Sequence, residues 1–95
     1  MNGNEAPGVC EQDATRSEAE DLILYASQRA TGATIHDTNG LIGCIRACLH
    51  ALDNPDKKKE AAWFQQTLNA ACARLRYYVA TGDYKEARRR TPFPE

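Results

Sequence analysis

The sequence predicts an all-α protein: a small helical bundle of three main helices plus a short C-terminal helix, built around a central antiparallel helical hairpin. Apolar residues recur at helical spacing on both sides of one interruption, Asp53-Asn54-Pro55-Asp56. No stretch alternates apolar and polar residues as a half-buried strand does. The length of 95 residues allows one domain with a modest core.

Composition divides the chain into three parts. Residues 1–15 hold almost no large apolar side chain and are predicted to be a disordered acidic head, residues 16–91 form the single helical domain, and residues 92–95 are a tail. Residues 1–21 carry six acidic side chains and one basic one, whereas residues 56–95 carry nine basic and five acidic ones. Exposed pairs between such regions are worth only ~0–1 kcal/mol, so solvated helix faces explain the asymmetry adequately.

The first helix is predicted to begin at Ser17, because Ser17-Glu18-Ala19-Glu20 has the pattern of a capping box. Gly32 is the predicted end. Leu24 and Tyr25 fall outside the apolar stripe, so they either cover a second neighbour or are exposed. The stripe itself consists of Ala19, Ile23, Ala26 and Ala30, with Leu22 beside it.

The second helix is predicted to begin at Asp37 or Thr38 and to end near Leu52, after a linker at residues 33–37 that lacks helical periodicity. Its apolar arc is wide, which is typical of a central helix with two neighbours. The arc contains Leu41, Ile42, Ile45, Cys48, Leu49 and Leu52.

The third helix is predicted to begin with Asn54 as N-cap and Pro55 in the first position, and to end before Gly82. Its main stripe should pack on the second helix. That stripe consists of Phe64, Leu68, Ala71, Cys72, Leu75, Tyr78 and Val79. A short fourth helix is expected from the capping pattern at residues 83–86 to Arg90, because Pro92 ends it.

A second stripe on the third helix is the predicted partner-binding surface. Trp63, Ala70 and Tyr77 lie well round from the main stripe, with Arg74 beside them. They must meet the first helix, another chain or water. Trp, Tyr and Arg dominate the energetic centres of interfaces. Binding of another protein is therefore expected, and a homodimer most of all because the core is small, while coverage by the first helix remains open.

Two basic clusters suggest an alternative, a phosphate-bearing ligand such as a nucleotide or nucleic acid. Arginines near tyrosines can bind phosphates and stack on bases. A pI of about 6.1 and the distance between the clusters weigh against it. The anion-binding candidates are Lys57, Lys58, Lys59, Arg74, Arg76, Arg88, Arg89 and Arg90.

Three cysteines fall on the hairpin, but a metal site or disulfide is not expected there. The register places Cys72 roughly 12 Å further from the turn than Cys44. That exceeds the ~7 Å Cα separation of a disulfide and the ~2.3 Å zinc–sulfur bond. Cys44, Cys48 and Cys72 are therefore predicted to be small buried residues, and Cys10 to be the reactive thiol.

Catalytic residues are not predicted. His36 and Asp37 are the only neighbouring histidine and carboxylate, and Cys44 could approach them, but a nucleophile also needs a third, orienting group. The simpler interpretation is that Asp37 caps a helix and His36 is solvated. No phosphate-binding loop, cofactor motif or metal motif is present, so no cofactor is expected.

Two segments resemble parts of the tetratricopeptide-repeat family. Tyr78–Ala87 is similar to the junction between the two helices of such a repeat, with tyrosine, glycine, tyrosine and alanine in matching places. Ala51–Pro55 followed by Ala61-Ala62-Trp63 resembles the turn between repeats. The resemblance covers about a third of the chain, without a second copy of the ~34-residue period. It implies helix-hairpin packing and, by analogy, binding of a peptide or protein.

The sequence as a whole predicts a non-enzymatic, cytoplasmic interaction module, such as an adaptor, an inhibitor or an immunity-type regulator. The N-terminus lacks the basic start and apolar run of a signal peptide. No segment reaches the roughly 20 apolar residues that cross a bilayer, so no membrane is expected as a partner.

Overall fold

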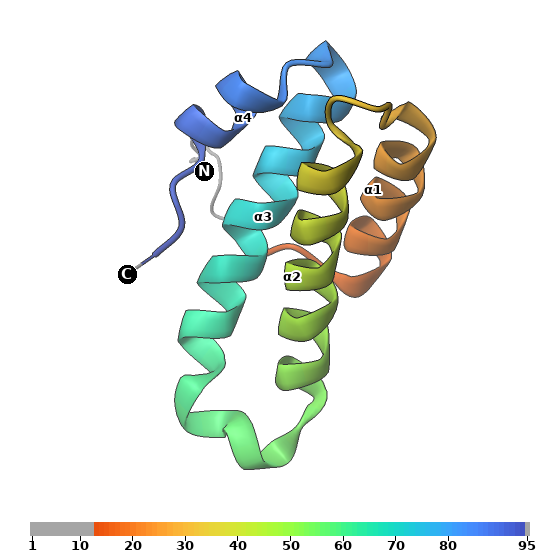
Figure 1. Ribbon diagram of the computed structural model, residues 1–95. Helices are drawn as coiled ribbons and strands as arrows, with labels where there is room; N and C mark the ends of the chain where they lie inside the picture. The colour runs from red at the N-terminus through yellow and green to blue at the C-terminus, as the bar shows by residue number, and fades with distance from the viewer. Residues whose placement is uncertain (1–12, 95) are drawn as a thin grey trace, which may run out of the picture.

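The computed structural model describes residues 13–94 and confirms the all-α class (Figure 1). Residues 1–12, which make up most of the predicted acidic head and include Cys10, lie outside the described residues. Within residues 13–94 there is no strand, and no helix is long and apolar enough to cross a membrane. The elements are α1 (Arg16–Arg29), α2 (Ile35–Asp53), the 3₁₀ helix η2 (Pro55–Glu60), α3 (Ala61–Thr81) and α4 (Tyr84–Arg90).

The hairpin of α2 and α3 is the centre of the molecule. The two helices run antiparallel, side by side, with η2 in the turn, and α1 packs along the half of the hairpin remote from that turn (Figure 1). The short helix α4 lies across the C-terminal end of α3. Helix α3 therefore contacts every other α-helix of the described chain, which explains why it carries two apolar stripes.

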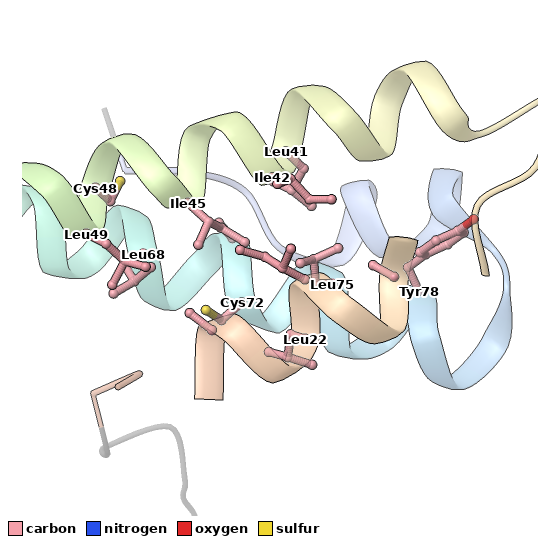
Figure 2. Close-up of a cluster of buried hydrophobic side chains, with 14 of the residues drawn as sticks. Leu22, Leu41, Ile42, Ile45, Cys48, Leu49, Leu68, Cys72, Leu75 and Tyr78 are labelled. Carbon is pink, nitrogen blue, oxygen red and sulfur yellow. The ribbon is translucent and has the colours of Figure 1, made fainter. Parts of the chain in front are cut away.

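The core confirms the predicted main stripes of all three long helices. Ile45, Leu68 and Leu75 are at most 1% exposed, and Figure 2 shows α1, α2 and α3 converging on them. Complete burial of such side chains contributes about 1.5–3 kcal/mol each. Around them lie Leu22, Ile23, Leu41, Ile42, Cys48, Leu49, Cys72 and Tyr78, with small alanines where helices approach closely.

The predicted cap of the first helix is wrong. Thr15, not Ser17, occupies the N-cap: its backbone is extended (φ −99°, ψ 163°), and its side-chain oxygen accepts a 3.1 Å hydrogen bond from the Glu18 N–H. Ser17 falls inside the first turn. The helix also ends at Arg29 rather than at Gly32.

Helix α2 begins at Ile35, so the predicted linker 33–37 is partly helical and Asp37 lies in the first turn rather than at the cap. Ile35 is 48% exposed, and an exposed apolar residue breaks the periodicity that reveals a helix start. Thr34 in the N-cap position makes no capping bond. Its hydroxyl instead shares a 2.6 Å hydrogen bond with the hydroxyl of Tyr78 and ties this turn to α3.

Both predicted ends of the third helix are confirmed, although its first six residues form η2 instead of an α-helical turn. The Asn54 side chain accepts a 3.0 Å hydrogen bond from the Asp56 N–H. Gly82 adopts the left-handed conformation (φ 78°), and its N–H donates to the Tyr78 carbonyl at 2.7 Å. These ends depend on local backbone chemistry, which the sequence carries directly.

Candidate functional site

Arg74, predicted at a partner surface, is instead packed inside the molecule. It is only 9% exposed. Its Nε donates to Thr91 Oγ1 at 3.1 Å and its Nη2 to the Thr91 carbonyl at 2.7 Å, while its guanidinium lies 4.1 Å from the centre of the Phe93 ring. The C-terminal segment after α4 thus covers Arg74 and removes it from any contact surface of the second stripe.

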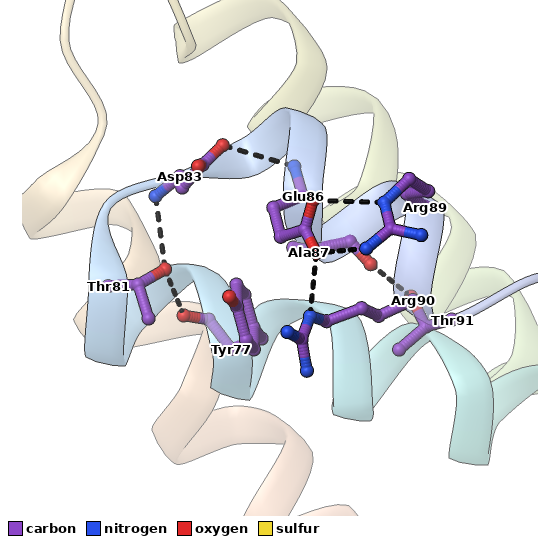
Figure 3. A network of polar contacts seen from close by, with 8 residues as sticks. All are labelled: Tyr77, Thr81, Asp83, Glu86, Ala87, Arg89, Arg90 and Thr91. Atoms are coloured by element: carbon purple, nitrogen blue, oxygen red, sulfur yellow. Dashed lines mark hydrogen bonds and ion pairs between the residues drawn. The ribbon is translucent and has the colours of Figure 1, made fainter.

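Tyr77 is also covered, by α4. Its ring is half-buried, with the guanidinium of Arg90 5.0 Å from the ring centre. Asp83 caps α4 by accepting a 3.0 Å hydrogen bond from the Glu86 N–H, and fully buried Ala87 lets the helix approach (Figure 3). The cover of this part of the stripe is therefore the short fourth helix, and neither the first helix nor a second chain is required.

Trp63, at the other end of the same stripe, is 45% exposed. Its ring contacts Phe64 edge-on, with ring centres 5.3 Å apart. Helix α4 lies at the far end of α3 and does not reach it (Figure 1). Ala70 lies between the two ends and is half-buried.

Three other large apolar side chains are exposed on the described surface. Leu24 is 54% exposed, Tyr25 51% and Ile35 48%. The open question about Leu24 and Tyr25 is thereby answered: they face away from the core. Single exposed apolar residues are normal on a soluble surface, so none of the three alone marks a site.

The eight basic candidates do not form one site. Lys58 and Lys59 are exposed on η2 at the turn of the hairpin, while the three arginines of α4 lie at the opposite end of α3 (Figure 1). The side chain of Lys57 is outside the described structure. Arg76 pairs with Glu18 across α1 and α3. The two basic clusters are therefore separated by the length of α3, as the sequence predicts, and anion binding by either of them stays a prediction.

Within α4, Glu86 takes up two of the three arginines. Arg89 and Arg90 both donate to its carboxylate, Arg90 Nε at 2.8 Å (Figure 3). These two hydrogen bonds lower the pKa of Glu86 from 4.5 to about 2. Arg88 remains, and it lines a cavity of about 480 Å³ that also contains Arg74. This cavity brings together two of the eight candidates, Arg74 and Arg88.

The predicted burial is confirmed for two of the three cysteines of the hairpin, Cys48 and Cys72, but not for Cys44. Cys48 and Cys72 are buried and Cys44 is half-buried, all three as free thiols. Burial raises the pKa of Cys48, with a contribution from neighbouring Cys44, and raises that of Cys72, each from 9.0 to about 11. Among residues 13–94, no group of three histidine, cysteine or acidic side chains is placed to hold a metal ion.

His36 and Asp37 are exposed and line the same cavity as Arg74. In the described residues no hydrogen bond joins His36 to a cysteine or to a carboxylate. A second hollow of about 520 Å³ lies between α1 and α2, and Arg16 there pairs with Asp53 and Glu20. Both carboxylates of this hollow, Glu20 and Asp53, already pair with Arg16.

Thr91 and Phe93, which hold Arg74, were not predicted as site residues from the sequence. Phe93 is the one large apolar residue between two prolines in the predicted tail, and that was the available signal. It packs against the core cluster.

Comparison of the chain with protein-family models, with characterised proteins and with solved structures gives no match.

Proposed function

We propose that the protein is a non-enzymatic, intracellular interaction module that binds another protein through the surface around Trp63. The supporting observation is the exposure of 45% of a tryptophan side chain on the central helix of the fold. Tryptophan is among the residues that most often dominate binding energy, because it buries a large area with few rotatable bonds. The local resemblance to a helix-hairpin repeat points in the same direction by analogy.

The Trp63 surface consists of Trp63, Gln66 and Ala70, which follow one another at i, i+3 and i+7 on α3. Residues at this spacing are neighbours on a helix face. Gln66 is exposed and Ala70 half-buried. A small residue and a flexible amide beside the indole leave room for a partner side chain to pack against the ring, which supports a contact centred on Trp63.

A second copy of the chain is the partner that we propose first. Twofold dimers are the commonest oligomers, and in a twofold contact the same patch meets itself. One tryptophan from each copy would then bury the other. An adaptor, inhibitor or regulator would use the same surface against a different protein.

The test is the association state of purified protein by light scattering over a range of concentrations. The wild type should form a dimer, and Trp63→Ala should be monomeric with an unchanged circular dichroism spectrum. Leu24→Ala is the matched control, because Leu24 is even more exposed but lies on α1. A dimer that survives Trp63→Ala, or that Leu24→Ala disrupts equally, would contradict the proposal. If the wild type is monomeric, the test is capture of host proteins, which should bind to the wild type but not to Trp63→Ala.

A second candidate function, binding of a phosphate-bearing ligand, is favoured by one observation only. That observation is the cavity shared by Arg74 and Arg88. The lysines of η2 lie away from it, at the turn of the hairpin.

A further inference from the structure

Arg74 is a buried cation that has no carboxylate partner among residues 13–94. Four exposed arginines of the described chain pair with acidic side chains, namely Arg16, Arg76, Arg89 and Arg90. Arg74, which is 9% exposed, has no carboxylate oxygen within 4.0 Å among residues 13–94. A buried charge is costly unless an opposite charge or strong hydrogen bonds compensate it. The most buried arginine of the described chain thus has no counter-charge among residues 13–94.

The neighbours of Arg74 fix its orientation without neutralising it. Thr91 accepts hydrogen bonds of 3.1 Å and 2.7 Å with its hydroxyl and carbonyl oxygens, both uncharged. Phe93 supports one face of the guanidinium at 4.1 Å. Arginine has five N–H donors, and the contacts with Thr91 occupy two of them. The remaining donors are held in place before any ligand arrives, which reduces the entropic cost of binding.

Arg74 is one of the residues that line a cavity of about 480 Å³. Asp37 and His36 of α2 form one wall, and Tyr84 and Arg88 of α4 form the other. The Tyr84 hydroxyl donates to the Asp37 carbonyl at 3.4 Å and links the two walls. Sites for small molecules commonly measure about 300–1,000 Å³, so the volume suits a compact organic ligand.

The charge of the lining favours an anion. Arg88 adds a second guanidinium to the lining. The other two arginines of α4 form ion pairs with Glu86 (Figure 3). Among the described residues that line the cavity, Asp37 is the one carboxylate, so two arginines against one aspartate give these residues a net positive charge. Guanidinium groups bind carboxylates and phosphates through paired, charge-assisted hydrogen bonds.

We propose that this cavity, defined here as the Arg74 site, binds a small organic oxyanion, a carboxylate or a phosphate ester with an apolar or aromatic body. The anionic group bonds to Arg74 and Arg88, and the body packs against Tyr84. The proposal deepens the second candidate function and rests on the same cavity. The site is at the opposite end of α3 from Trp63, so it is independent of the proposed protein interaction. Either one can fail without the other.

Calorimetric titration of the full chain with benzoate and with phenyl phosphate tests the Arg74 site. At least one probe should bind the wild type in the millimolar range or tighter. Loss of a charged hydrogen bond weakens binding by roughly tenfold or more, so Arg74→Gln should bind at least that much more weakly. The probe that binds more tightly distinguishes a carboxylate from a phosphate ester.

Two further variants keep the test decisive if Arg74→Gln disturbs the fold. Arg88→Gln removes an exposed side chain without touching the Thr91 contacts, and it should weaken binding severalfold. Arg76→Gln is the matched control, since Arg76 is also on α3 but pairs with Glu18. No binding of either probe by the wild type overturns the proposal. Equal weakening by Arg76→Gln and Arg88→Gln also overturns it, because the effect is then nonspecific charge.

Discussion

The two ends of the second stripe on α3 each carry an aromatic side chain, but the described chain covers the C-terminal end much more than the N-terminal end. At the C-terminal end, Tyr77 lies under Arg90, and Arg74 lies under the segment that follows α4. At the N-terminal end, Trp63 is nearly half exposed. A helical stripe therefore shows which face of a helix needs cover, but the cover itself is decided by elements elsewhere in the chain.

This difference separates two kinds of function along one helix. At the covered end a cavity is lined by residues of α2, α3 and α4, and the Tyr84 hydroxyl links α4 to α2 by its hydrogen bond to the Asp37 carbonyl. The open end keeps an aromatic side chain available for another protein. The covered end therefore fits the proposed binding of a small ligand, and the open end fits the proposed binding of a protein. Substitutions at one end should leave the function of the other end unchanged.

The largest expected effect contrasts the core with the open end. Leu75→Ala removes a fully buried side chain of α3 and should lower the free energy of unfolding by about 2–5 kcal/mol. Trp63→Ala should cost about 1 kcal/mol or less in the monomer, since half of its surface is already in water. Urea unfolding of both variants measures the difference. A loss at Trp63 as large as at Leu75 would mean that the indole is structural.

The ends of α3 show how far sequence alone reaches. Asn54 and Gly82 were predicted correctly because a cap and a left-handed glycine are local features. The start of α1 was misplaced from Thr15 to Ser17, since two hydroxyl residues two positions apart offer similar caps. Which of them adopts the extended backbone conformation is decided by how the preceding residues meet α3: the Ala14 N–H donates to Asn69 at 2.8 Å.

The site was less predictable than the fold. Trp63, Tyr77 and Arg74 were found as a group by their spacing, but spacing carried no information on the contact of Arg74 with Phe93. That contact joins residues far apart in sequence through a turn at Gly82 and a seven-residue helix. The spacing of the basic residues likewise carried no information on their ion pairs. Glu18 and Glu86 together pair with three of these arginines.

The next effect concerns the turn that brings α4 onto the covered end. Gly82→Ala forces a side chain into a left-handed conformation, and its Cβ would lie 2.6 Å from Arg29 Nη2. We expect a loss of about 1–2 kcal/mol in the free energy of unfolding. Gly43→Ala is the control. Gly43 lies on the exposed face of α2, where an added Cβ would meet no atom within 4 Å, so this variant should gain about 0.5–1 kcal/mol in the free energy of unfolding. The same sign for both variants would contradict this account of Gly82.

A smaller gain is expected from the hydroxyl of Thr38, which lies one turn after Thr34 at the covered end. It is fully buried, and its Oγ1 has no hydrogen-bond partner within the described chain. Thr38→Val should raise the free energy of unfolding by about 1 kcal/mol, because it removes an unsatisfied polar group at nearly constant shape. Thr67→Val is the matched control. The Thr67 hydroxyl donates to the Trp63 carbonyl at 2.8 Å, so removing this hydroxyl should leave the free energy of unfolding unchanged or lower it.

The smallest effect is a dependence on pH at the covered end. The arginines beside Glu86 hold the pKa of its carboxyl at about 2, below the ordinary 4.5. A depressed pKa in the folded state stabilises α4 fully above pH 4.5, and this contribution is lost as the pH falls toward 2. An NMR titration of the Glu86 carboxyl should give a midpoint near 2, and amide exchange in α4 should accelerate over the same range. Glu86→Gln should remove that acceleration, while a midpoint near 4.5 would show that Arg89 and Arg90 are not held and that both are free to join Arg88.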